Sequence, residues 1–199
     1  MKIIITGAAG FIGYHLAKKL LAENHEIIGI DNLNDYYDLS LKNDRLGNLQ
    51  SSEDFTFFQQ NIADTNQISE IFKSHNDAKI IINLAAQAGV RYSLENPFAY
   101  IESNVSGMTS IFEAAKNNLP NLDRIIYASS SSVYGNSEDA PFNEAQRVDE
   151  PVSLYAATKK SGEMIAHYYA NTFKIPMIGL RFFTVYGEFG RPDMALFLF

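Results

Sequence analysis

The sequence predicts an α/β fold in which helices cover both faces of a doubly wound parallel sheet. Short β-branched apolar runs alternate along the chain with longer segments of helical character, which is the pattern of parallel strands joined by crossover helices. Two runs, at residues 3–5 and 80–82, are apolar throughout, as expected for strands buried on both faces. No repeat or Pro/Gly-rich linker divides the 199 residues, and this length suffices for one domain with a sizeable core.

The elements are expected in strict alternation. The predicted strands cover residues 2–6, 26–31, 55–59, 79–84, 124–129 and 176–180. The helical segments between them cover 11–23, the more polar 39–49, 66–74 and two long helices at 97–117 and 153–173. In the helix at 97–117, five apolar residues recur on one face, namely Ile101, Val105, Met108, Phe112 and Ala115.

Composition excludes several classes of protein. Hydrophobic residues make up 46% of the chain and charged residues 20%, as in ordinary soluble globular proteins. No membrane span is expected, because no apolar run reaches about 18 residues. The first seven residues are expected to form a buried strand, not a signal peptide. The chain has no cysteine, so disulfide and thiolate chemistry are excluded and a cytoplasmic location is expected.

The net charge of −7 argues against nucleic acid as a partner, since such proteins present a basic face. An anionic substrate would need local cations to capture it; the candidates are Arg91, Lys159, Arg181 and Arg191. The four histidines are scattered without ligand spacing, so no metal site is expected.

A glycine-rich turn joins the first strand to the first helix. Gly7 permits the tight turn, Gly10 lets the backbone approach a pyrophosphate, and Gly13 lets the helix pack closely on the sheet. Phe11 and Ile12 open the helix, whose N-terminus favours phosphate. The alternative is a simple tight strand–helix turn, but the sequence context favours a dinucleotide site of the Rossmann type.

The second strand ends at Asp31, eighteen residues after Gly13. A carboxylate at this place accepts hydrogen bonds from the ribose hydroxyls of the adenosine. It also repels a 2′-phosphate, and no arginine follows in the stretch that begins with Asn32. The sequence therefore predicts NAD, not NADP, although Asp31 alone could equally be a loop cap.

Tyr155 and Lys159 stand four residues apart, on one face of the last long helix. A neighbouring cation favours the phenolate form of a tyrosine, which can then act as a base. Such a pair alone is often only a solvated surface pair. Here a serine-rich strand exit at 129–132 is expected at the same sheet edge, and its hydroxyls can bind a substrate oxygen beside the phenol. The alternative is an ordinary polar loop exit.

The spacing of the glycines and the Tyr-x-x-x-Lys pair resemble the extended branch of the short-chain dehydrogenase/reductase superfamily along the whole chain. This resemblance implies Tyr155 as catalytic base and acid, with Lys159 lowering its pKa and holding the nicotinamide ribose. Ser130 matches the catalytic Ser/Thr position. The resemblance also places Asn61 and Ile62 at the adenine, where the branch usually has Asp, and the strand exit at Leu84, Ala85 and Ala86 along the cofactor ribose.

Within that branch, several segments resemble UDP-glucuronate 4-epimerases, namely 85–93, 129–135, 180–187 and 190–195. Dehydratases of the branch carry carboxylates where Ser131 and Ser132 stand, so dehydration is set aside. Arg91, Thr184 and Arg191 are candidates to bind a uronate carboxylate or a diphosphate. Ordinary surface or capping roles remain open for each. Residues 188–189 read Glu-Phe where this subgroup usually has Pro-Trp.

The resemblance implies an NAD-dependent epimerase that converts UDP-glucuronate to UDP-galacturonate through a 4-keto intermediate. Its helices at 97–117 and 153–173 form the dimer interface in the family, so a homodimer is plausible. We expect a Rossmann domain at 1–181 and the start of a substrate-binding region at 182–199, with the C-terminal substrate domain largely absent and 195–199 exposed. The alternatives are an NAD-binding fragment without turnover, or another UDP-sugar epimerase or oxidoreductase.

Overall fold

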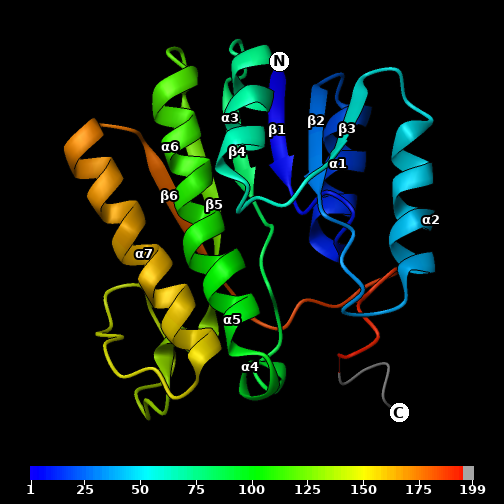
Figure 1. The fold of residues 1–199 in the computed structure, drawn as a ribbon. Helices are drawn as coiled ribbons and strands as arrows, with labels where there is room; N and C mark the ends of the chain where they lie inside the picture. The colour runs from blue at the N-terminus through cyan, green and yellow to red at the C-terminus, as the bar shows by residue number, and fades with distance from the viewer. Residues whose placement is uncertain (195–199) are drawn as a thin grey trace.

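The computed structural model describes residues 1–194 and confirms the doubly wound sheet. Six parallel strands lie in the order β3-β2-β1-β4-β5-β6 (Figure 1). The chain order changes direction between β1 and β4, where the carboxyl ends of the strands open a crevice. The strands are β1 (Lys2–Thr6), β2 (Glu26–Asp31), β3 (Phe55–Gln59), β4 (Ile80–Asn83), β5 (Arg124–Ser130) and β6 (Met177–Phe182).

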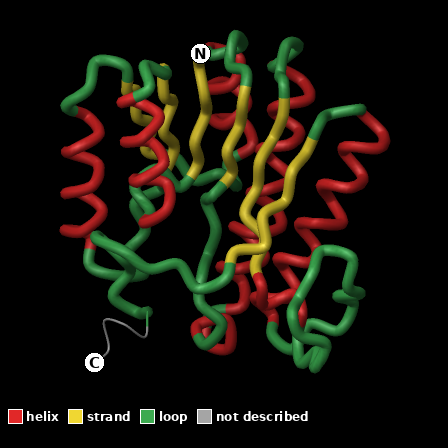
Figure 2. Tube along the Cα trace, turned by 180° about the vertical axis from the view of Figure 1, so that it is seen from behind, coloured by secondary structure: helices red, strands yellow, loops and turns green. Residues whose placement is uncertain are grey.

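Helices cover both faces of the sheet, as predicted. Figure 1 shows α3 (Thr65–Ser74), α6 (Met108–Asn118) and α7 (Leu154–Phe173) in front of the sheet. The opposite face carries α1 (Phe11–Ala22) and α2 (Leu39–Gln50), seen from behind in Figure 2. The short α4 (Tyr92–Glu95) and α5 (Pro97–Tyr100) lie below the carboxyl edge, next to the base of α7 (Figure 1).

The strand sequence divides the core into two layers. Side chains alternate between faces along a strand, so Ile4 packs under α3, α6 and α7 while Ile3 and Ile5 pack under α1 and α2. All three isoleucines are buried. This explains why β1 is apolar at every central position.

The predicted long helix at 97–117 is present without a break, but its winding changes along its length. It divides into α5, a π-helical stretch η1 (Ile101–Gly107) and α6. The cause is tertiary: buried Asn104 is drawn inward, where its amide pairs with the Gln87 backbone and with Thr158 on α7. The altered winding leaves Ile101 43% exposed, so the predicted apolar stripe begins only after it.

The strand β6 forms one edge of the sheet and ends two residues later than predicted. Its side chains Ile178 and Leu180 point to the face that carries α1 and α2, yet both remain exposed. Within residues 1–194, no helix is long and apolar enough to cross a membrane, and no cluster of potential metal ligands is found. The run 195–199, for which we expect exposure, lies outside the described residues.

Candidate active site

The structure brings the sequence-predicted site residues together around one cavity. It has a volume of about 820 Å³ and lies at the carboxyl edge of the sheet, between β1 and β4–β5. The dinucleotide candidates on its wall are Gly7, Gly10, Phe11, Ile12, Gly13, Asp31, Asn32, Asn61, Ile62, Leu84, Ala85 and Ala86. The catalytic and substrate candidates on its wall are Ser130, Ser131, Ser132, Tyr155, Lys159, Arg91, Thr184 and Arg191.

The glycine positions of the turn leave no room for a side chain. Gly7 adopts a positive φ of 71°, and its N–H donates to the Ile30 carbonyl at 2.7 Å. A Cβ added at Gly13 would lie 2.0 Å from the Gly7 carbonyl oxygen. The N-cap of α1 is Gly10, so no side chain caps the first turn of the helix. Its N-terminal amides therefore face the cavity without an internal acceptor, as a diphosphate site requires.

Asp31 is buried at the end of β2. Its carboxylate accepts the backbone N–H groups of Ala9, at 3.1 Å, and Leu33, at 2.9 Å. Burial raises the pKa of Asp31, and these two amides together with Lys42 and Arg45 oppose the rise. The carboxylate thus serves as a loop cap while its residue lines the cavity. Its hydrogen bonds to a ribose stay a prediction.

Sequence reasoning missed several residues at this end of the cavity. Asn34, Tyr36, Tyr37 and Lys42 line the wall. The Lys42 ammonium donates to the backbone and side-chain oxygens of Asn34 at 2.7 and 2.6 Å. The signal was present, because the polar loop 32–37 directly follows a parallel strand, whose carboxyl end faces the ligand crevice. At Asn61 the amide is used internally: its oxygen accepts from Ala63 and its nitrogen donates to Glu102.

The catalytic candidates converge from two elements. Ser130 ends β5, and α7 begins at Leu154, where Ser153 caps it by accepting from Ala156 at 3.1 Å. This places Tyr155 in the first turn of α7. Burial raises the pKa of the Tyr155 phenol, and the Ser130 hydroxyl and the Arg191 charge oppose the rise.

Lys159 is only 8% exposed. Its ammonium donates to the Ala128 carbonyl at 3.0 Å and lies 5.9 Å from the centre of the Tyr155 ring. Burial lowers the pKa of Lys159 from 10.5 to about 8. The lowering of the Tyr155 pKa by this ammonium stays a prediction.

Replacing Lys159 with methionine should stabilise the protein at pH 7. A shift from 10.5 to about 8 corresponds to at most about 3 kcal/mol at ~1.36 kcal/mol per pKa unit, so we expect a gain of about 1–3 kcal/mol in the free energy of unfolding. The wild type loses the buried charge as pH rises through about 8, so the gain should shrink between that pH and 10.5. Urea titrations across this range measure it; a gain that does not depend on pH contradicts the assignment of a buried ammonium.

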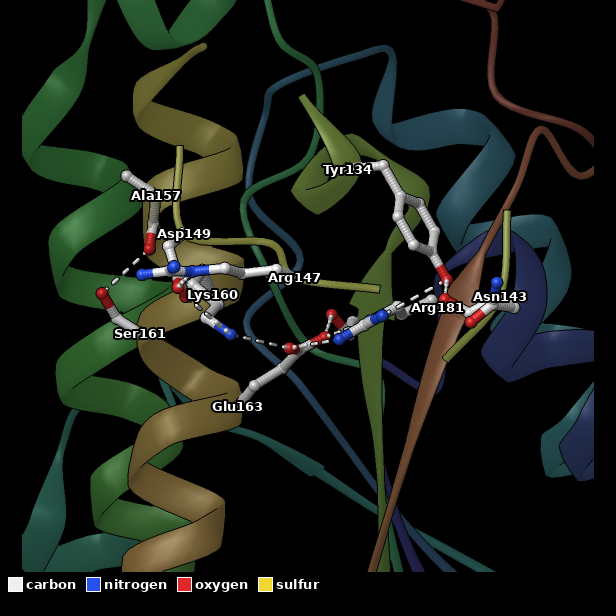
Figure 3. Close-up of polar contacts among 10 residues, drawn as sticks. Tyr134, Asn143, Arg147, Asp149, Ala157, Lys160, Ser161, Glu163 and Arg181 are labelled. Atoms are coloured by element: carbon white, nitrogen blue, oxygen red, sulfur yellow. Dashed lines mark hydrogen bonds and ion pairs between the residues drawn. The ribbon is translucent and has the colours of Figure 1, made fainter. Parts of the chain in front are cut away.

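A polar network supports the serine-bearing strand end (Figure 3). The Glu163 carboxylate, one turn beyond Lys159, receives two hydrogen bonds from Arg181, at 2.8 and 3.0 Å, and one from Ser129 at 2.7 Å. Burial raises the pKa of Glu163, but these bonds outweigh it and hold the pKa below its ordinary value. The prediction that Arg181 captures an anion is therefore wrong. Its side chain pairs with Glu163 on α7 and does not line the cavity.

The substrate candidates line the same cavity. Ser131 and Ser132 begin the 3-10 turn after β5, and Thr184 follows β6. The Arg191 guanidinium donates to both carboxylate oxygens of Asp193, at 3.0 and 3.1 Å, and Tyr36 donates to the same carboxylate. Arg91 is exposed at the rim. Cationic and hydroxyl groups thus line the same cavity as the phenol.

Comparisons with known proteins agree with this geometry. The family model described as "NAD dependent epimerase/dehydratase family" matches residues 3–199. "Protein CapI" of Staphylococcus aureus is 53% identical over the whole chain, which spans 58% of that relative. "UDP-glucuronate 4-epimerase 2" of Arabidopsis thaliana is 46% identical, and the chain spans 45% of its length. The crystal structure of UDP-glucuronic acid 4-epimerase from Bacillus cereus in complex with UDP-glucuronic acid and NAD superposes with a TM-score of 0.91 at 38% identity, covering 99% of this chain and 61% of that one.

Proposed function

The chain belongs to the NAD dependent epimerase/dehydratase family, and from this premise we propose that it supplies the NAD-binding and catalytic part of a UDP-glucuronate 4-epimerase. The observation that carries the proposal is the shared cavity. It is lined by a glycine turn whose free amides suit a phosphate, by Tyr155, Ser130 and Lys159, and by two arginines, Arg91 and Arg191. The chain spans about 58% of the first matched relative. The proposal therefore concerns the part that these cavity residues play in the epimerase reaction.

The residues of the cavity have distinct roles in this proposal. The glycine turn and Asp31 would hold NAD, which would supply a hydride acceptor for C4 of the sugar and a hydride donor to the opposite face of the same carbon. Tyr155 removes the proton of the C4 hydroxyl and gives it back, while Ser130 binds the same sugar oxygen. Lys159, buried on the cavity wall, would hold the nicotinamide ribose. Hydride removal leaves a 4-keto sugar, which must turn over within the site before reduction.

The uronate is the proposed substrate because the sugar side of the cavity carries fixed cations in a chain of net charge −7. Arg191 offers a planar fork that suits a carboxylate, and at present it holds the carboxylate of Asp193 in that way. Thr184 lies on the same segment as Arg191 and adds a hydroxyl. Arg91 stands at the rim for the diphosphate. UDP-sugars without a carboxylate are the alternative substrates.

Calorimetric titration of UDP-glucuronate into the NAD-loaded chain, with UDP-glucose for comparison, tests this proposal. We expect Arg191→Met to weaken uronate binding about tenfold or more, the effect of losing hydrogen bonds to a charged group, and to leave UDP-glucose nearly unaffected. Arg147→Met is the matched control, because Arg147 also pairs with an aspartate two residues later but lies outside the cavity wall. NAD binding without a response to either sugar nucleotide would instead indicate a cofactor-binding unit that lacks a complete substrate site.

We also propose a homodimer through α5, η1, α6 and α7. Apolar side chains are exposed on α5, η1 and α7, namely Phe98, Ile101, Met164 and Tyr168. Exposed apolar groups on neighbouring helices are typical of association surfaces.

A further inference from the structure

Arg45 is a fully buried cation in α2 that forms no direct ion pair among the described residues, and the charge of Asp31 acts on it only from beyond contact distance. One of its terminal nitrogens donates to the Ala9 carbonyl at 3.0 Å and to the Tyr37 hydroxyl at 2.7 Å. The other donates to the Phe189 carbonyl, while its Nε has no acceptor. The guanidinium therefore depends on neutral oxygens from three separate parts of the chain.

Two of these parts adjoin residues that line the cavity, although Ala9 and Phe189 themselves do not line it. Ala9 lies inside the glycine turn, between Gly7 and Gly13. Phe189 belongs to the segment 183–194, which follows β6 and carries Thr184 and Arg191. Figure 1 shows this segment running from β6 beneath the carboxyl edge of the sheet to α2. Arg45 thus joins the cofactor side of the cavity to the sugar side.

Further contacts hold the same stretch against α1. His15 pairs with the Glu188 carbonyl at 2.7 Å, and the Phe189 ring lies 5.4 Å from the Tyr14 ring. Phe189 has a positive φ of 55°, which is uncommon for a residue with a bulky side chain. Its carbonyl is therefore directed to Arg45 by a backbone conformation that needs support from its surroundings.

The planar fork of Arg45 makes its two carbonyl contacts interdependent. A buried guanidinium that loses one acceptor is left with an unsatisfied charged group, which is strongly unfavourable. Arginine holds such oxygens in a fixed relative geometry, unlike lysine. Ala9 is also held through its own N–H, which donates to the Asp31 carboxylate. A ligand that orders the glycine turn therefore favours the position of Phe189 in which Arg45 keeps both oxygens.

We propose that Arg45 is a positioning residue that couples the glycine turn to the segment 183–194, so that NAD binding orders the segment that carries Thr184 and Arg191. The sugar nucleotide then binds more tightly after NAD than before it. This second statement rests on the proposed function, whereas the coupling between turn and segment does not. The energetic coupling is reciprocal, so the sugar nucleotide also tightens NAD.

Hydrogen–deuterium exchange of the chain with and without NAD tests the coupling without any sugar nucleotide. In the wild type, NAD should slow exchange both at residues 7–13 and at 186–191, the latter by about fivefold or more, as in typical coupling between sites. Replacing a buried charge with an apolar side chain of similar volume is commonly tolerated, so Arg45→Met should fold. In this variant, protection should remain at 7–13 and disappear at 186–191. Arg45→Lys keeps the charge but lacks the fork, and should lose the same protection.

Arg124→Met serves as the control, since Arg124 is exposed at the start of β5, at the opposite end of the strands. It should behave as the wild type does. Wild-type protection confined to 7–13, or unchanged protection of 186–191 in both Arg45 variants, overturns the proposal. Titration of UDP-glucuronate with and without NAD completes the test: the wild type should show an affinity ratio of about fivefold or more and Arg45→Met a ratio near one. Failure of wild-type sugar binding would count against the proposed function and leave the exchange result to judge Arg45.

Discussion

Replacing Gly13 with alanine is expected to abolish NAD binding. The new Cβ would lie 2.0 Å from the Gly7 carbonyl oxygen and 2.9 Å from the Gly7 carbonyl carbon. Both are backbone atoms, so either the turn or α1 must move. Movement misdirects the N-terminal amides that face the diphosphate, and each charge-assisted hydrogen bond lost corresponds to about tenfold or more in affinity. We expect a loss of at least about 100-fold in NAD affinity and about 1–3 kcal/mol in the free energy of unfolding.

Calorimetry with NAD and urea unfolding measure these two effects. Gly47→Ala is the matched control, because Gly47 lies within α2 and nothing stands within 4 Å of its added Cβ. That change should stabilise the protein by about 0.5–1 kcal/mol, since glycine is a poor helix residue. It should leave NAD affinity unchanged. Wild-type NAD affinity in Gly13→Ala would show that the diphosphate does not depend on this turn.

Replacing Tyr155 with phenylalanine should remove turnover while sparing binding. The change deletes only the hydroxyl to which we assign the proton exchange with the sugar, and general acid–base catalysis contributes about 100- to 10,000-fold. We expect conversion of UDP-glucuronate to fall by about 1,000-fold. Because the ring remains against Tyr100, 6.1 Å between centres, the cavity should keep its shape. Calorimetry should accordingly show nearly unchanged affinity for NAD and for the sugar nucleotide.

Tyr168→Phe is the control for Tyr155→Phe. Tyr168 lies on the same helix, more than half exposed, and packs against Tyr169 and Phe173 away from the cavity. Its loss of a hydroxyl should leave conversion unchanged. Substantial turnover in Tyr155→Phe would assign the proton transfer to another group, and the Ser130 hydroxyl would be the next to replace.

Much of the fold could be predicted from the sequence because its signals are local. Residues 3–5 and 80–82 are apolar at consecutive positions, which fits only a strand covered on both sides. The rule that carboxyl ends of parallel strands share one edge then predicted that Gly7, Asp31 and Ser130 lie close together. The helical repeat put Tyr155 and Lys159 on one helix face, whereas their catalytic roles and the choice of Thr184 came from the family resemblance. The cavity wall contains all of them.

Only the tertiary structure decided where side chains with several possible partners point. The sequence predicted that Arg181 binds an anion, but in the structure its guanidinium pairs with Glu163. The sequence also predicted a regular α-helix at 97–117, but the structure has a π-helical stretch there that contains Asn104, which binds Gln87 and Thr158. Arg45 carried no signal at all, because its acceptor on Phe189 lies 144 residues away. Local periodicity fixes which face of an element is apolar, since that depends on neighbours in sequence. The choice of a polar partner depends on distant segments that only the packed chain brings within reach.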